Sequence, residues 1–596
     1  MDIYEKLKDI IEVKKHRLSA MLFTEESKQG LDTQDMAVFD LMKNIASLAF
    51  NISDGNVEII PYIVTNESRS FAIDDLSDTD YDLLLSLDLE KLPLNLKARI
   101  SDILWIQKRN YNSAIVAAES YYDLFNLWFS DKDWLEALKM IKRAICISAQ
   151  LKKQDLYDKY CQTVYNHIIR IDGNDTDFLS ISLIRILLFQ SYKDLGSIIP
   201  VIDRIINNSQ DNPHKAEQAF ELKSDCLNKV KKKELAIQTN VDMADYLVDY
   251  GEKVLINDIQ GPLRAQHFFG KAINTYRNNG QPEKANKTHK RLVEIQKDIP
   301  RLMKPIAIPF DSQPVIDNIK QNMVGFSFEE SIIRLAQMVP FYKKDDFKKK
   351  VFEESPFSQM FTSAFLNSNG QTTYTLPGLD LSNPEKDPEL LDNHIHHKML
   401  EHEKIFGNAY GHNILAYIKD NFNIENESLD FLLSNNFLIP EGRESIFRSA
   451  IVMALSGRYY EAIHILAPQT ENVFRYIAKE VGALTVTLET DGTSKEKVLS
   501  SIFDLPELID SYDNDILFLF KGLLNEQAGA NIRNEIAHGI INLYSASSGA
   551  SIYFICAVIK LLVISSRECT ELFLNENEKF KSIVPLEKSD LNIEDK

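Results

Sequence analysis

The chain is poor in residues that interrupt helices and in residues that cross-link extracellular domains. Its 596 residues include only 21 glycines and 19 prolines, and these two residues have the lowest helix propensities. The five cysteines form no CxxC pair, and an odd number without regular spacing is typical of reduced, buried thiols. The N-terminus is charged throughout, and the most apolar run, Ile552 to Ile564, is too short to span a bilayer and contains Lys560. We expect a cytoplasmic protein that does not bind a membrane.

Several common catalytic motifs are also absent. The sequence has no GxxxxGK[ST] loop, no GxGxxG turn that opens a helix after a strand, and no GxSxG elbow. The pair His402-Glu403 begins like the zinc motif HExxH, but Phe406 stands where the second histidine belongs. A histidine cluster surrounds this pair and could gather a metal or form a polar helix face: His394, His396, His397, His402 and His412. We expect no metal and no cofactor.

Positive charge is scarce. The chain has 67 lysines and arginines against 87 aspartates and glutamates, for a formal net charge of −20. A protein with this net charge lacks the broadly basic surface that is typical of nucleic-acid-binding proteins, so any contact with RNA must come from a local basic site.

The abundant Leu, Ile, Ala, Lys and Glu favour an all-α protein. Breaks rich in proline and glycine divide the helical patterns, first at Ile299 to Pro314. We expect five segments: an N-terminal helical region (1–94), an α-solenoid region (95–300), a middle helical region with a long loop at 367–388 (301–439), a C-terminal helical bundle with a small β-hairpin (440–575) and a charged tail (576–596).

The clearest repeat-like unit is a helical hairpin from Pro262 to Lys297. A proline opens each helix, Gly280 separates them, and alanines and aromatic residues recur on one face. This hairpin resembles tetratricopeptide units, although no strict period is visible. Arrays of this kind present a groove to a protein partner or serve as a plain scaffold.

In the C-terminal segment the apolar periodicity predicts helices at 443–456, 459–481, 494–503, 514–525, 531–539 and 549–574. The alternating stretch ALTVTLETDGT predicts a β-hairpin with Asp491-Gly492 at its tip.

The most informative stretch is Asn531 to Gly539, NIRNEIAHG. Asn531 is a suitable N-cap and Gly539 a suitable stop, so we expect a short helix. Asn534 and His538, four residues apart, then share one face, and the long side chain of Arg533 can swing toward the imidazole. These three side chains could converge on one anion.

The helix expected at 459–481 carries a polar stripe of His464, Glu471 and Arg475. Buried charge needs a partner. We therefore expect this helix to pack against 531–539, with Glu471 holding Arg533 or His538.

These residues resemble a known family. Arg533 to Gly539 matches the RNxxxHG signature of an uncharacterised C-terminal domain family and, more broadly, the Arg-x4-6-His motif of the HEPN superfamily. Tyr459 to Arg475, YYEAIHILAPQTENVFR, resembles the conserved helix of the same family. The resemblance covers about the last quarter of the chain.

The resemblance implies a metal-independent endoribonuclease that leaves 2′,3′-cyclic phosphate and 5′-hydroxyl ends on RNA. His538 would be the general acid or base, Arg533 would stabilise the charged phosphorane, and Asn534 would orient the reacting groups. The active cleft of that superfamily lies between two copies, so a homodimer through the C-terminal domain is expected. By family analogy alone, the protein would act in a stress response or in phage defence.

Two alternatives remain open. The Arg-Asn-x3-His set could be a hydrogen-bond knot that closes a helical core, or the domain could bind nucleotide or RNA without turnover. In either case the protein would be a helical adaptor and not an enzyme. The tyrosine that some superfamily members carry two residues after the histidine is replaced here by Ile540, so modification of such a tyrosine is not expected.

Overall fold

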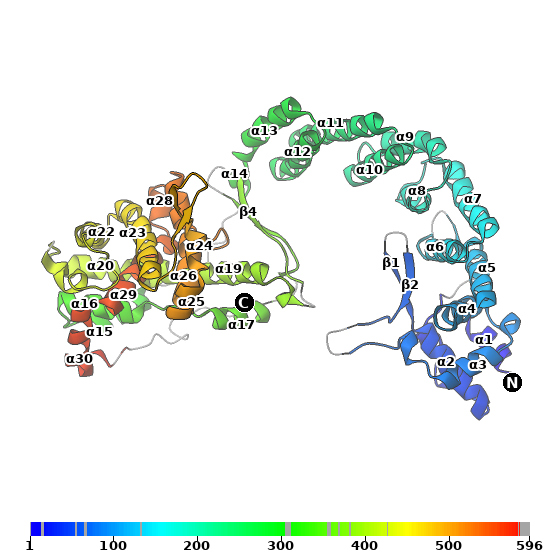
Figure 1. Ribbon diagram of the computed structural model, residues 1–596, viewed down its shortest axis with the longest axis horizontal. Coiled ribbons are helices and arrows are strands. Elements are labelled where there is room, and N and C mark those ends of the chain that lie inside the picture. The colour runs from blue at the N-terminus through cyan, green and yellow to red at the C-terminus, as the bar shows by residue number, and fades with distance from the viewer. Residues whose placement is uncertain are drawn as a thin grey trace. The chain divides into compact units, whose positions relative to one another are not determined.

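The computed structural model describes residues 2–12, 17–53, 56–64, 68–130, 134–303, 312–354, 359–366, 370–380, 383–425, 427–581 and 583. The chain divides into two compact units. Unit 1 comprises Met1–Met303 and Asn369–Gln371, and unit 2 comprises Lys304–Ser368 and Thr372–Lys596. In the described part the protein is all-α, with three small two-stranded antiparallel sheets (Figure 1).

In unit 1, most of the helices from α4 to α13 pack against their neighbours in the sequence. Its strands β1 (Ala49–Ser53) and β2 (Asn56–Ile60) form one hairpin. Its helices are α1 (Ile3–Ile10), α2 (Thr33–Ala46), α3 (Asp78–Ser86), α4 (Leu94–Lys108), α5 (Tyr111–Trp128), α6 (Leu135–Gln150), α7 (Gln154–Ile171), α8 (Leu179–Phe189), α9 (Ile199–Asn208), α10 (Pro213–Lys229), α11 (Lys233–Asn257), α12 (Gly261–Asn278), α13 (Pro282–Gln296) and α14 (Ile299–Leu302).

The solenoid character follows from these sequential contacts. The hairpin expected at 262–297 is α12 and α13, and Gly280 between them has a φ of 71° that suits glycine. The N-terminal region has its own apolar cluster, and α4 contributes to it through Leu96 and to the solenoid cluster through Ala98.

A buried ion pair attaches the β1–β2 hairpin to the helices of unit 1. Arg143 on α6 donates two hydrogen bonds to Asp102 on α4, at 2.7 and 2.8 Å, and a third to the carbonyl of Val57 on β2, at 2.7 Å. Tyr121 also donates to Asp102, at 3.1 Å. Because the guanidinium and the carboxylate are both buried and paired, they hold three elements in one arrangement.

Unit 2 contains two hairpins, β3 (Ser363–Leu366) with β4 (Thr372–Leu376), and β5 (Val486–Leu488) with β6 (Ser494–Glu496). Its helices are α15 (Gln313–Met323), α16 (Phe328–Met338), α17 (Lys344–Glu353), α19 (Pro388–Phe406), the π-helical turn η7 (Gly407–Gly411), α20 (His412–Asn421), α21 (Asp430–Leu433), α22 (Glu444–Leu455), α23 (Tyr459–Glu480), α24 (Leu499–Phe503), α25 (Pro506–Ser511), α26 (Asn514–Leu524), α27 (Ile532–Ala537), α28 (Leu543–Ala546), α29 (Gly549–Ser565), α30 (Arg567–Asn575) and α31 (Asn577–Phe580).

One hydrophobic core runs through unit 2 from Val315 to Phe580. Its centre is α29, which is buried over most of its length and contacts α16, α19 and α23. The start of α29 comes so close to η7 that a Cβ on Gly407 would lie 1.8 Å from the carbonyl oxygen of Gly549. The boundary expected near residue 440 lies inside this shared core, and the middle region and the C-terminal region belong to one compact unit.

Two predicted helices differ from the structure. The helix expected at 494–503 begins only at Leu499, because 494–496 pair with β5 as strand β6. The helix expected at 549–574 ends at Ser565, because the hydroxyl of Ser566 accepts the N–H of Cys569 and caps a separate helix, α30. The hairpin with Gly492 at its tip, at φ 84°, is confirmed.

All five cysteines lie in the described residues and are buried as free thiols. Among the helices described, none has the length and apolar character needed to cross a membrane.

Glu403 of α19 provides a test of the core of unit 2. Its side chain is 3% exposed, and burial raises its pKa to about 8. An unfolded glutamate has a pKa of about 4.3, so between these values the unfolded chain releases a proton that the folded chain keeps. The free energy of unfolding therefore falls as the pH rises through this window, by up to about 1.4 kcal/mol per pH unit from this group.

We expect Glu403→Gln to remove this part of the pH dependence, as measured by denaturant unfolding across the same window. Glu401→Gln, at an exposed position of the same helix, is the control and keeps the wild-type slope. An unchanged slope in Glu403→Gln would contradict the assignment.

Candidate functional site

The motif Asn531–Gly539 forms α27 and the turn that ends it. Asn531 precedes the helix with a φ of 51°, and Gly539 follows it with a φ of 65°. The stop at Gly539 is confirmed. The expected N-cap is corrected in one respect: Asn531 occupies the cap position, but its side chain accepts no backbone N–H, because its oxygen binds the side chain of Asn534 instead.

The loop that leads into α27 is held against α26 by a close backbone contact. The carbonyl of Gly522 accepts the N–H groups of Ala530 and Asn531, at 3.0 and 3.4 Å. A Cβ on Gly529 would lie 2.3 Å from that same oxygen, so only glycine fits there. This contact fixes the start of the short helix.

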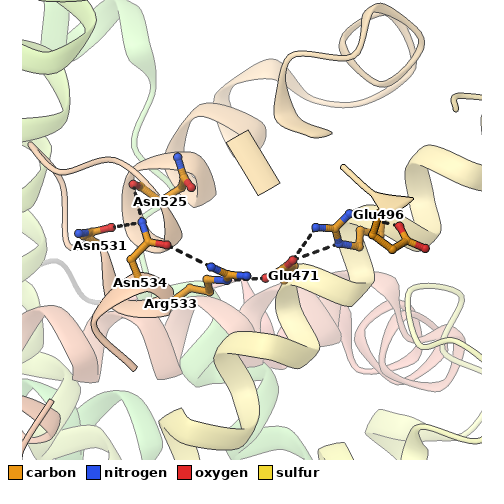
Figure 2. Close-up of polar contacts among 7 residues, drawn as sticks. Glu471, Glu496, Asn525, Asn531, Arg533 and Asn534 are labelled. Carbon is orange, nitrogen blue, oxygen red and sulfur yellow. Dashed lines mark hydrogen bonds and ion pairs between the residues drawn. The ribbon is translucent and has the colours of Figure 1, made fainter. Parts of the chain in front are cut away.

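Both the nitrogen and the oxygen of the Asn534 carboxamide form hydrogen bonds. Its nitrogen donates to the side-chain oxygen of Asn531, at 2.7 Å, and to the carbonyl of Asn525, at 3.2 Å. Its oxygen accepts from Nη1 of Arg533, at 3.2 Å. Figure 2 shows these bonds as one chain that leads from the loop to Arg533. Asn534 is therefore held in one orientation.

The other end of this chain is Glu471 on α23. Its carboxylate accepts from Nε of Arg533, at 2.7 Å, and from Arg475 one helical turn further along, at 2.6 and 3.1 Å (Figure 2). Arg475 also reaches Glu496 on β6, at 3.4 Å. The expected contact between Glu471 and Arg533 is confirmed. The side chain of Glu471 is 12% exposed and that of Arg533 is 37% exposed, so the pair lies at the rim and not in the core.

A pocket of about 540 Å³ opens beside α27. Asn534 and His538 both line it, as their shared helix face predicts, and His538 is exposed. Arg533 is not among the lining residues, because Glu471 holds its guanidinium on the α23 side. The three side chains therefore do not all converge on the pocket as expected. Asn534 and His538 line it, and Arg533 is hydrogen-bonded to Asn534.

His464 does not join this cluster. Its Nδ1 lies 2.7 Å from the carbonyl of Tyr460, and its ring packs against that tyrosine, with centroids 4.1 Å apart. It shares the helical stripe of Glu471 by angle, but the offset of seven residues separates the two side chains along the helix axis.

Among the lining residues that sequence reasoning missed are two aromatic and two charged side chains: Phe365, Tyr374, Lys404 and Glu535. Glu535 lies inside the motif itself. Burial raises the pKa of its carboxyl, and the charge of Lys404 opposes this effect. The two aromatic residues belong to β3 and β4, which flank Asn369-Gly370; that dipeptide is a hairpin signal and could have located them.

The histidine cluster is dispersed. His394 bonds the carbonyl of Pro377, at 2.8 Å, and His396 stacks on Phe518 with centroids 3.9 Å apart. Burial lowers the pKa of His396 to about 3, so its ring is neutral at pH 7. Within the described residues no three His, Cys, Asp or Glu side chains come together in a way that could hold a metal.

Comparison with known proteins found a similarity for a part of the chain that lies outside the site. Residues 1–159 are similar to a domain of unknown function, DUF7380. No curated protein and no solved structure matches the chain.

Glu471→Gln tests whether this carboxylate holds α23 and α27 together. It leaves Arg533 without its charged partner and leaves Arg475 only the longer contact with Glu496. We expect it to lower the free energy of unfolding by about 2 kcal/mol. Thermal unfolding measures the change. Glu496→Gln is the control: its side chain is 53% exposed and bonds Arg475 at 3.4 Å, so its effect stays below about 0.5 kcal/mol. Equal losses in the two variants would refute the role of Glu471.

Proposed function

We propose that unit 2 is a metal-independent endoribonuclease of the HEPN type. The observation that carries this proposal is that His538 and Asn534 line one pocket while Arg533 hydrogen-bonds Asn534. The order Arg-Asn-x3-His and the helix at 459–480 are the residues on which the family resemblance rests.

RNA cleavage of this type requires a group that transfers protons near neutral pH and hydrogen-bond donors that stabilise the phosphorane transition state. The 2′-oxygen of the RNA forms a bond to the adjacent phosphorus while the bond from phosphorus to the 5′-oxygen breaks. One proton leaves the 2′-hydroxyl and another reaches the departing 5′-oxygen. His538 performs one of these transfers, and the same histidine of a second copy is available for the other.

Asn534 and Arg533 act as positioning and charge-stabilising groups. The bonds to Asn531 and Asn525 hold Asn534 at the pocket wall. Arg533 uses Nε and Nη1 for Glu471 and Asn534, and over a third of its side chain stays exposed. Arg533 therefore polarises Asn534 and adds positive charge beside the pocket.

The proposal includes a homodimer. Directly after the motif, Ile540, Leu543 and Tyr544 are 47%, 73% and 89% exposed. Apolar side chains grouped beside a functional site are typical of an interface. A second copy that covers them brings its own His538 close to the same RNA. Unit 1, with its array of helices, then serves to bind a protein partner or to control the nuclease in a stress or defence response.

The second candidate is an adaptor that binds nucleotide or RNA without cleaving it. The ion pair between Arg533 and Glu471 favours this candidate, because it withdraws the guanidinium from the pocket.

Cleavage of labelled single-stranded RNA in EDTA separates the two candidates. We expect wild type to cleave and to leave cyclic-phosphate ends. His538→Ala should lower the rate by at least about 100-fold, because general acid–base catalysis contributes that much. Arg533→Ala should also lose most activity. The exposed His289 in unit 1 supplies the control His289→Ala, with unchanged activity. Folding is verified by circular dichroism, and a wild type that binds RNA but never cleaves it would establish the adaptor.

Leu543→Asp tests the dimer. A carboxylate placed at the centre of the apolar patch is costly to bury, so we expect the variant to sediment as a monomer of 68.3 kDa while wild type sediments as a dimer. Leu235→Asp, at an exposed position of unit 1, is the control and leaves the dimer intact. A monomeric wild type would contradict this part of the proposal.

A further inference from the structure

The pocket beside α27 has an aromatic wall that the motif does not supply. The hairpin β3–β4 contributes Phe365 and Tyr374, which face each other across the two strands. Their rings are 5.6 Å apart and tilted by 44°. Both residues are only partly buried, and both line the pocket.

Helix α19 packs against Phe365 of this aromatic pair. His397 meets Phe365 edge to face, with centroids 4.9 Å apart and planes at 87°. Burial lowers the pKa of His397, which favours the neutral ring and suits contact with an aromatic side chain. Leu400 and Lys404 follow three and seven residues later, so the same face of α19 continues along the pocket wall.

Lys404 places an ammonium group at the pocket. Its side chain is exposed and forms no ion pair with any residue that the structure describes. Glu535 also lines the pocket, and within the described chain its carboxyl likewise has no hydrogen-bond partner. The pocket is therefore lined by aromatic rings, by a lysine that has no ion-pair partner in the described chain and by other polar side chains.

We propose that this pocket binds one nucleotide of single-stranded RNA, with the base stacked on Tyr374 and its phosphate between Lys404 and His538. This inference rests on the proposed function and specifies how its substrate is held. A volume of about 540 Å³ is in the range of pockets that hold ligands of this size. Every base has a π-face, so stacking on an aromatic side chain recognises unpaired RNA of many sequences.

This mode of binding also suits an acidic protein. Stacking does not depend on charge, whereas phosphate contacts do. With one phosphate held at Lys404, we expect affinity to fall only weakly with salt, with a logarithmic slope of about −0.7.

The experiment uses the full chain and a fluorescent 2′-O-methyl RNA octamer, which cannot be cleaved because its 2′-oxygens are blocked. We expect Tyr374→Ala to weaken binding about ten-fold, since stacking of one base contributes that much. Tyr374→Phe keeps the aromatic face and should bind as wild type does. Lys404→Ala should weaken binding and remove the salt dependence. Tyr62→Ala, at an exposed tyrosine of unit 1, is the control and binds normally.

Tyr374→Leu keeps an apolar side chain without an aromatic face and replaces Tyr374→Ala if that variant unfolds. Wild-type affinity in these variants, or no binding by wild type, would overturn the inference. Cleavage of natural RNA separates the two proposals. If RNA is cleaved through His538 and Tyr374 variants bind normally, the inference fails and the nuclease stands. If wild type binds through Tyr374 but does not cleave, the nuclease fails and the binding site stands.

Discussion

The arrangement of the candidate site depends on one carboxylate. Glu471 accepts hydrogen bonds from Arg533 on α27 and from Arg475 on its own helix, and so joins two elements separated by some sixty residues of chain. Charge-assisted bonds of this kind are short and directional. Because Arg533 is held, it can in turn bond Asn534, and Asn534 closes the network onto the loop before α27. A short helix that is marginal by itself thereby acquires a defined position.

This constraint divides the motif into two parts. Arg533 faces α23 and supports the structure, whereas His538 faces the pocket and is free to meet a ligand. The pocket gains further walls from α19 and from the β3–β4 hairpin, which belong to the region before residue 440. The site is therefore a property of the whole of unit 2. One hydrophobic core extends through both regions and joins the elements that carry these walls.

Much of the fold could be predicted from the sequence. Apolar periodicity located α22, α23, α26 and α29, and the α12–α13 hairpin followed from its prolines and Gly280. Local signals failed where a tertiary contact decides the outcome. Ser566 interrupts a continuous apolar pattern because its hydroxyl caps α30, and residues 494–496 become a strand because β5 lies beside them.

The site was predictable only in part, for the same reason. The four-residue spacing placed Asn534 and His538 on one face, and the need to pair a buried charge indicated the contact between Glu471 and Arg533. The dipeptide Asn369-Gly370 could have located the hairpin that carries Tyr374, but no local signal shows that Tyr374 or Lys404 comes close to α27. His464 matched by helical angle alone, and angle does not measure distance along a helix.

The most direct test is a structure of the full chain with bound 2′-O-methyl RNA. The account predicts a phosphate within hydrogen-bond distance of His538, one base against Tyr374, and Arg533 still paired with Glu471. RNA bound elsewhere on the protein, with no phosphate near His538, would contradict it.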